Sequence, residues 1–175
     1  YGGWHVASNT LAANAIVYSF GLGEDASFDL ELIKRFGVTV HCFDPTPKSL
    51  AWAAKQGFPA QLIIHGIGLA DYDGEATFHP PANPNNVSHT MLNRQASEAQ
   101  DIVVPVSRLE TLMNQLNHQN IDLLKMDIEG AEYAVIEDLE KTKIRPKQLL
   151  IEFHHRFEGV GVARSKEAIS RLKKL

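Results

Sequence analysis

The chain has 175 residues, of which 44% are hydrophobic and 22% are charged, and its formal net charge is −4. A negative charge without a run of Lys or Arg argues against a nucleic-acid partner, and no apolar run approaches the roughly 18 residues of a membrane-spanning helix. The single cysteine, Cys42, excludes an internal disulfide and a cysteine-based zinc site. We expect one cytoplasmic domain over residues 1–175, without a nucleic-acid or membrane partner and of open oligomeric state. The first residue is Tyr1 rather than Met, which is compatible with a trimmed segment.

The first part of the chain alternates strand and helix signals. The apolar run 15–20 ends in glycines and predicts a buried strand. Apolar residues at helical spacing over 28–36 then precede Gly37, which is typical of a glycine-capped helix. Residues 38–43 and 61–65 predict two more strands. Between them, Thr46 is placed to cap a helix that has Pro47 in its first turn and ends at Gly57.

The middle of the chain, residues 71–106, has a different character and is expected to be an insertion with a lid-like loop. It contains a turn at 71–74, a short strand at 75–79 and a proline-rich segment at 80–86 that cannot form regular structure. Residues 87–92 and 102–106 are further candidate strands. Ser107 and Glu110 have capping-box spacing ahead of an apolar helix face.

The alternation resumes with strands at 121–128 and 148–153 and helices at 131–139 and 165–175. Strands that alternate with helices predict an α/β fold: a Rossmann-like, doubly wound, mostly parallel sheet with helices on both faces. In such sheets the ligand lies beyond the carboxyl ends of the strands. The residues that follow each strand are therefore the candidates for function.

A nucleoside cofactor is indicated by the ends of the first two strands. Gly21-x-Gly23-x-x-Ala26 fits a permissive dinucleotide fingerprint, and Asp44 follows Gly23 by 21 residues, a spacing suited to ribose hydroxyls. Each feature also has a plain structural interpretation, as a tight turn and as a helix-capping residue.

The charges after the glycines discriminate between cofactors. A dinucleotide places a pyrophosphate at this turn, where the sequence has Glu24 and Asp25. Like charges in a partly buried site cost on the order of 1–4 kcal/mol, whereas a sulfonium and an ammonium are attracted. The pattern favours S-adenosylmethionine, although both acids also suit the dipole of the following helix.

Two carboxylates follow the strand at 121–128. Asp127 and Glu129 alternate in strand register, so both can face the ligand crevice and orient a hydroxyl, take its proton or hold a cation. The alternative is that they are acids at a helix N-terminus, a role that Glu132 fits well.

Acidic and imidazole side chains also end the strand at 148–153. Glu152 within an apolar strand needs a partner if it is buried, and His154 shares its strand face. An imidazole at a strand end suits a general base, so His154 is a catalytic candidate and His155 a weaker one. A metal site of Asp127, Glu129 and His154 is conceivable, but no His-x-x-x-His spacing supports it, and we expect no metal.

Four segments together resemble the FkbM-type methyltransferase family: FGLGED, FDPTP, LLKMDIEGAEYAVI and LLIEFHHRF. The resemblance implies a Rossmann-like class I fold, S-adenosylmethionine as cofactor and methyl transfer to an oxygen of a small molecule or sugar. From the motifs and the resemblance together we expect cofactor contacts at Phe20, Gly21, Gly23, Glu24, Asp44, Pro45, Gly68 and Asp127. The expected catalytic residues are Asp127, Glu129 and His154, and the expected acceptor contacts are Ser88, His89 and His155.

Departures from the family pattern leave other interpretations open. Ser19 stands where class I methyltransferases commonly have an acid, and Asp25 stands in place of a third glycine. The chain ends at Leu175, where the fold normally continues into a terminal strand pair, so it is a fragment or a shortened variant. The alternatives are a non-catalytic Rossmann-like binding domain and, less favoured, a nicotinamide-dependent oxidoreductase.

Overall fold

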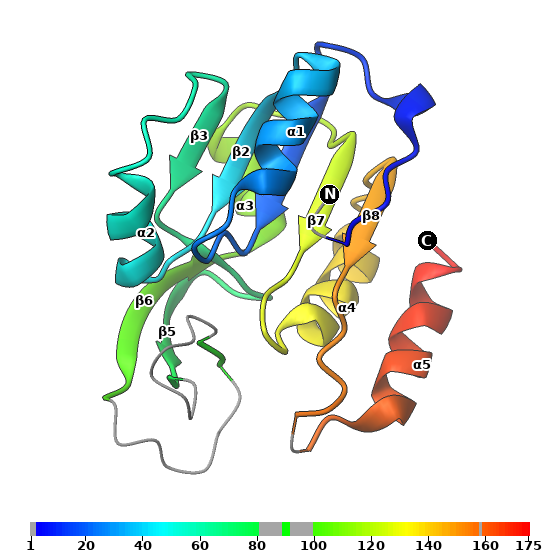
Figure 1. Cartoon of the computed structure of the whole chain (residues 1–175). Helices are drawn as coiled ribbons and strands as arrows, with labels where there is room; N and C mark the ends of the chain where they lie inside the picture. The colour runs from blue at the N-terminus through cyan, green and yellow to red at the C-terminus, as the bar shows by residue number, and fades with distance from the viewer. Residues whose placement is uncertain (1–2, 81–88, 92–99, 158) are drawn as a thin grey trace.

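The computed structural model describes residues 3–80, 89–91, 100–157 and 159–175. Five parallel strands form the central sheet in the order β3-β2-β1-β7-β8 (Figure 1). Their bounds are β1 Ile16–Phe20, β2 Thr39–Phe43, β3 Leu62–His65, β7 Leu123–Met126 and β8 Gln148–Ile151. The chain runs from β1 outward to β3 and then crosses to β7 on the other side of β1. The strand order therefore reverses between β1 and β7, the point at which α/β sheets bind ligands.

Helices cover both faces of this sheet (Figure 1). Helices α1 (Ser27–Phe36) and α2 (Pro47–Ala53) share one hydrophobic core with the apolar side chains of one sheet face. Helices α3 (Leu109–Gln115), α4 (Glu132–Thr142) and α5 (Gly161–Leu172) share a second core with the other face. The predicted doubly wound Rossmann-like fold is confirmed. A 3₁₀ turn at Ser8–Thr10 precedes β1.

A second, smaller sheet combines strands of the expected insertion, residues 71–106, with a short strand directly before it. Strands β4 (Gly68–Leu69) and β5 (Gly74–Phe78) both pair with β6 (Ile102–Ser107), β4 in parallel and β5 antiparallel. Of the candidate strand at 87–92, residues 89–91 are described, and there Thr90 forms an isolated antiparallel bridge with His79. Among these residues no strand follows β8, and no helix has the length and apolar character needed to cross a bilayer.

Local signals predicted the helix ends with mixed success. Gly37 caps α1 in the left-handed conformation, as expected, and Thr46 and Pro47 begin α2. The capping box was wrong: α3 begins after Arg108 without a side-chain cap, and the Ser107 hydroxyl donates to Asp73 instead. The last helix begins at Gly161, four residues earlier than predicted, and α2 ends at Ala53, before Gly57.

Candidate active site

A pocket lies at the carboxyl ends of the central strands, where the strand order reverses. It encloses about 120 Å³, within about 650 Å³ of space that includes open solvent. The rings of Phe20 and Phe43 stack with centroids 4.4 Å apart and contribute apolar surface. The described lining residues are Phe20, Gly21, Leu22, Gly23, Phe43, Asp44, Pro45, Thr46, Gly68, Leu69, Phe78, His89, Asp127, Ile128 and Glu129.

The glycine turn, residues 21–25, forms one wall of the pocket and passes directly over the end of β7. Gly21 has a φ of 90°, and a Cβ added there would lie 2.0 Å from the backbone oxygen of Asp127. Its own carbonyl accepts a hydrogen bond of 2.9 Å from the buried Lys125 ammonium. Only glycine fits this position without a shift of the backbone, so the turn and the β7 end are packed as one unit.

Asp44 fixes the same turn from β2. Its Oδ2 accepts hydrogen bonds from the backbone N–H groups of Leu22 (3.1 Å) and Gly23 (2.9 Å). Its Oδ1 accepts from the Thr46 N–H (2.9 Å) and hydroxyl (2.6 Å). Four donors occupy the lone pairs of this buried carboxylate. Asp44 lies at the pocket as predicted, but a bond to ribose hydroxyls has to compete with the bonds that hold the turn.

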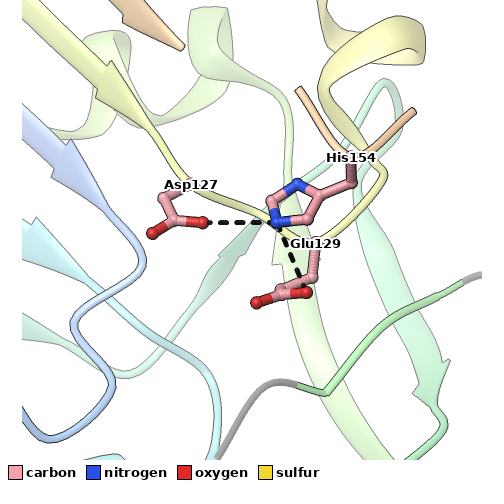
Figure 2. Close-up of side chains that lie close together, drawn as sticks. All are labelled: Asp127, Glu129 and His154. Atoms are coloured by element: carbon pink, nitrogen blue, oxygen red, sulfur yellow. Dashed lines mark ion pairs between the residues drawn. The ribbon is translucent and has the colours of Figure 1, made fainter. Parts of the chain in front are cut away.

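A carboxylate–histidine cluster of Asp127, Glu129, Glu132 and His154 lies at the other end of the pocket, where Asp127 and Glu129 belong to the pocket lining and Glu132 and His154 stand behind them. Glu132 is fully buried and accepts hydrogen bonds from the N–H groups of Ile128 and Gly130 and from His154 Nδ1 at 2.8 Å. This contact turns His154 Nε2 toward Glu129 Oε2 (3.5 Å) and Asp127 Oδ1 (3.7 Å), as Figure 2 shows. The cluster joins the strand ends of β7 and β8 to the start of α4.

The surroundings of the cluster shift two pKa values. Burial raises the pKa of Asp127 to about 6, against the lowering effect of the Lys125 charge. Burial lowers the pKa of His154, but the hydrogen bond to Glu132 and the charges of Glu129 and Asp127 outweigh it and raise that pKa to about 9. At neutral pH His154 then carries a proton on both ring nitrogens. This arrangement favours a carboxylate over His154 as the proton acceptor.

Comparison with known proteins assigns the chain that forms this pocket to a protein family. The family described as "Methyltransferase FkbM domain" matches residues 12–174. The chain belongs to this family. The Homo sapiens protein named "Probable methyltransferase-like protein 24" is 30% identical over 158 residues, which cover 89% of this chain and 37% of that protein. "2-O-methyltransferase NoeI" of Sinorhizobium fredii is 23% identical over 145 residues, which cover 75% of this chain and 59% of that protein.

The chain thus spans less than two thirds of the length of these relatives. No solved structure gives a significant match. The family membership agrees with the resemblance seen in the sequence motifs, and it supports methyl transfer as the general activity of the FkbM domain described here.

Most residues expected from the FkbM resemblance meet at the pocket. The structure brings together Phe20, Gly21, Gly23, Asp44, Pro45, Gly68, His89, Asp127 and Glu129. His154 reaches this group through its ion pairs with Asp127 and Glu129. Ser88 lies outside the described residues.

Three residues are placed differently from expectation. Glu24 does not line the pocket; its carboxylate lies 4.0 Å from the Lys48 ammonium, and both side chains are exposed. His155 does not line the pocket either. Glu152 is exposed rather than buried within the strand, because β8 ends at Ile151.

Sequence reasoning missed the role of Glu132 as a link between the cluster and the backbone. Its place in the first turn of α4 was correctly predicted. Its bond to His154, 22 residues further along the chain, had no local signal, because it depends on the pairing of β7 with β8.

Proposed function

We propose that this domain transfers a methyl group from S-adenosylmethionine to a hydroxyl oxygen of a small molecule or sugar. The observation that carries the proposal is the charge of the pocket. Among its described lining residues, Asp44, Asp127 and Glu129 are acidic, and none is Lys or Arg. A dinucleotide pyrophosphate would find no Lys or Arg among these residues, whereas a cofactor with a sulfonium and an ammonium would be attracted to the carboxylates.

The shape of the pocket also suits this cofactor. The glycine turn lets a ligand approach the backbone closely, since no side chain stands at Gly21 or Gly23. Stacked Phe20 and Phe43 offer apolar surface to an adenosine moiety, and Asp44 stands at the end of β2, where a ribose would lie. Glu24 and Asp25 contribute less than the sequence suggested: Glu24 lies outside the pocket lining, and Asp25 accepts a hydrogen bond from the Ser27 N–H at the start of α1.

S-adenosylmethionine supplies a methyl group that is already activated by its positive sulfur. The protein then has to hold the acceptor oxygen in line and accept its proton. Asp127 and Glu129 are the carboxylates that line the pocket beside the glycine turn. With Glu132 fixing His154 behind them, these two side chains are the proton acceptors that we propose.

An oxygen acceptor is supported by one relative, whose name describes a 2-O-methyltransferase. His89 lines the pocket and belongs to the segment that we expect to meet the acceptor. We propose a small molecule or carbohydrate as acceptor, and neither nucleic acid nor membrane as a partner.

Calorimetric titration of S-adenosylmethionine tests the cofactor. We expect binding to the wild-type domain, at least 10-fold weaker binding to Asp44→Ala, and unchanged binding to Asp71→Ala, which removes an exposed acid outside the pocket lining. Undetectable binding to folded wild type, or unchanged affinity in Asp44→Ala, would sink the assignment. Binding without methyl transfer to any member of a panel of hydroxyl acceptors would instead favour a non-catalytic binding domain.

A further inference from the structure

Three side chains of the carboxylate–histidine cluster converge on one point at the pocket wall. Asp127 and Glu129 come from the loop between β7 and α4, and His154 follows β8 (Figure 2). One ligand atom from each residue can be chosen such that all three lie within 4.8 Å of one another. Two oxygens and one nitrogen that follow two separate strand ends therefore lie near one another.

The separations within this group are unlike those of direct hydrogen bonds. His154 Nε2 lies 3.5 Å from Glu129 Oε2 and 3.7 Å from Asp127 Oδ1, whereas N–H···O bonds span about 2.7–3.2 Å. Metal–ligand bonds of about 2.0–2.2 Å place two neighbouring ligand atoms roughly 3.0–3.6 Å apart. The three groups are thus too far apart to bond one another well, and close to the spacing of ligands around one ion.

The imidazole is also oriented as metal-bound histidines are. Its Nδ1 donates to Glu132, whose side chain is fully buried, so that Nε2 is the nitrogen left to face the two carboxylates. A carboxylate behind the ring is the usual outer partner of a metal-binding histidine, where it fixes the ring and makes it a better donor. Glu132 is itself held by the backbone N–H groups of Ile128 and Gly130.

We propose that Asp127, Glu129 and His154 bind a divalent metal ion. Two carboxylate oxygens and one imidazole nitrogen suit Mn²⁺ and related first-row ions, because oxygen ligands favour Mn²⁺ and Mg²⁺ while imidazole favours Zn²⁺ and Fe²⁺. The ion takes the place of the proton on Nε2 and balances the two carboxylates. Three protein ligands leave positions open for a substrate.

The open positions face the acceptor, and this part of the inference rests on the proposed function. A hydroxyl bound to the ion becomes more acidic, and its proton can pass to the carboxylate oxygen of Asp127 or Glu129 that does not ligate the ion. The acceptor oxygen then forms its bond to the methyl carbon as the carbon–sulfur bond breaks, and the electron pair stays on sulfur. An acceptor with a second oxygen beside the hydroxyl would fill two positions on the ion, so vicinal hydroxyls are the favoured substrate class.

Electron paramagnetic resonance of free Mn²⁺ tests the site without cofactor or acceptor. We expect the wild-type domain to take up one Mn²⁺ per chain, and Glu129→Gln and His154→Gln each to weaken this binding at least 10-fold. Glu75→Gln is the matched control, because it makes the same chemical change at an exposed position on β5 and should leave binding unchanged.

Circular dichroism should be used to check that each variant is folded. If His154→Gln is unstable, Glu129→Gln still provides the test, because glutamine has nearly the same shape as glutamate. No Mn²⁺ uptake by wild type, or equal uptake by wild type and both cluster variants, overturns the proposal. Calorimetry with S-adenosylmethionine on the same samples separates the two hypotheses: if the wild-type domain binds S-adenosylmethionine but takes up no Mn²⁺, the metal site is refuted and the proposed function is not.

Discussion

Both ends of the pocket are built on a buried carboxylate that collects backbone N–H groups at the end of a strand. At one end, Asp44 holds the glycine turn through Leu22 and Gly23. At the other end, Glu132 holds the turn after β7 through Ile128 and Gly130. The exposed fractions of the two residues are 6% and 0%, so in each case the N–H groups would have little water to replace the carboxylate.

The two carboxylates differ in their remaining partner. Asp44 accepts its fourth hydrogen bond from the neutral hydroxyl of Thr46, which makes the glycine end self-contained. Glu132 holds the imidazole of His154, which faces Asp127 and Glu129 in turn. The same structural device therefore gives a fixed binding wall at one end and a connected group of ionisable side chains at the other. Substitutions should separate these two roles.

Asp44→Ala should have the largest effect on stability. It leaves the N–H groups of Leu22, Gly23 and Thr46 without their acceptor, and each unsatisfied buried donor costs about 1–3 kcal/mol before water relieves part of the loss. We expect the free energy of unfolding to fall by about 3–4 kcal/mol in urea denaturation. Asp71→Ala should change it by less than about 0.5 kcal/mol. A loss below 1 kcal/mol in Asp44→Ala would show that the turn does not depend on this carboxylate.

Glu132→Gln should cost less, about 2–3 kcal/mol. Glutamine keeps an oxygen for the backbone N–H groups but loses the charge that faces His154, and hydrogen bonds to charged groups contribute about 1.5–3 kcal/mol. A double-mutant cycle with His154→Gln should give a coupling energy of about 1–2 kcal/mol. The control is Glu137→Gln, on the same helix but exposed. Additive effects of Glu132→Gln and His154→Gln would mean that the two residues act independently.

The two ends of the pocket also show which of their features could be predicted from the sequence. The glycines, Asp44, Asp127 and Glu129 all follow strands that apolar runs made visible, and parallel strands end at one edge. Their meeting at the pocket was therefore predictable. The four hydrogen bonds that Asp44 accepts could not be predicted, because they depend on how closely β1 and β2 bring the glycine turn to the carboxylate.

Contacts between distant elements had no local signal at all. The bond between Glu132 and His154 requires that β7 and β8 pair in a particular register. In a similar way, Ser107 had the spacing of a helix cap, but its hydroxyl donates a hydrogen bond to Asp73, in the turn before β5. In both cases a partner distant in sequence decided the contact, and the local pattern did not predict it. The helix cap at Gly37 was predicted correctly, because a left-handed cap depends on the conformation of the glycine itself.

Gly21→Ala tests whether the two ends are packed as one unit. The added Cβ would meet the Asp127 carbonyl at 2.0 Å, whereas Gly57, with a similar left-handed φ of 60°, has open space around it. Both substitutions carry the strain of an alanine at positive φ, about 1–2 kcal/mol. The steric clash should make Gly21→Ala less stable than Gly57→Ala by about 2 kcal/mol. Equal melting curves for the two variants would contradict the close approach of the turn to β7.

The smallest expected effect on stability comes from three histidines that lie away from the carboxylates. Their protonation decides at which pH the stabilities of variants at the two ends of the pocket can be compared. His41 Nδ1 lies 3.0 Å from His65 Nε2, the His41 ring meets that of His118, and Tyr18 bonds His118. Burial, with the charges of His65 and His118, lowers the pKa of His41 to about 4. Burial also lowers the pKa values of His65 and His118. In His154, by contrast, adjacent carboxylates raise the pKa.

A lowered histidine pKa predicts a loss of stability in acid. Between about pH 6.5, the ordinary value for histidine, and about pH 4, the unfolded chain binds protons that the folded chain does not, so the free energy of unfolding falls as the pH falls. Urea denaturation between pH 7.5 and 4.5 should show this slope, and His41→Gln should reduce it by an amount on the order of 1 kcal/mol across the window, after allowance for solvent screening. His5→Gln, at an exposed position, should leave the slope unchanged. If His41→Gln also leaves it unchanged, the acid sensitivity arises elsewhere, and the Asp44 and Glu132 variants must then be compared at several pH values rather than at neutral pH alone.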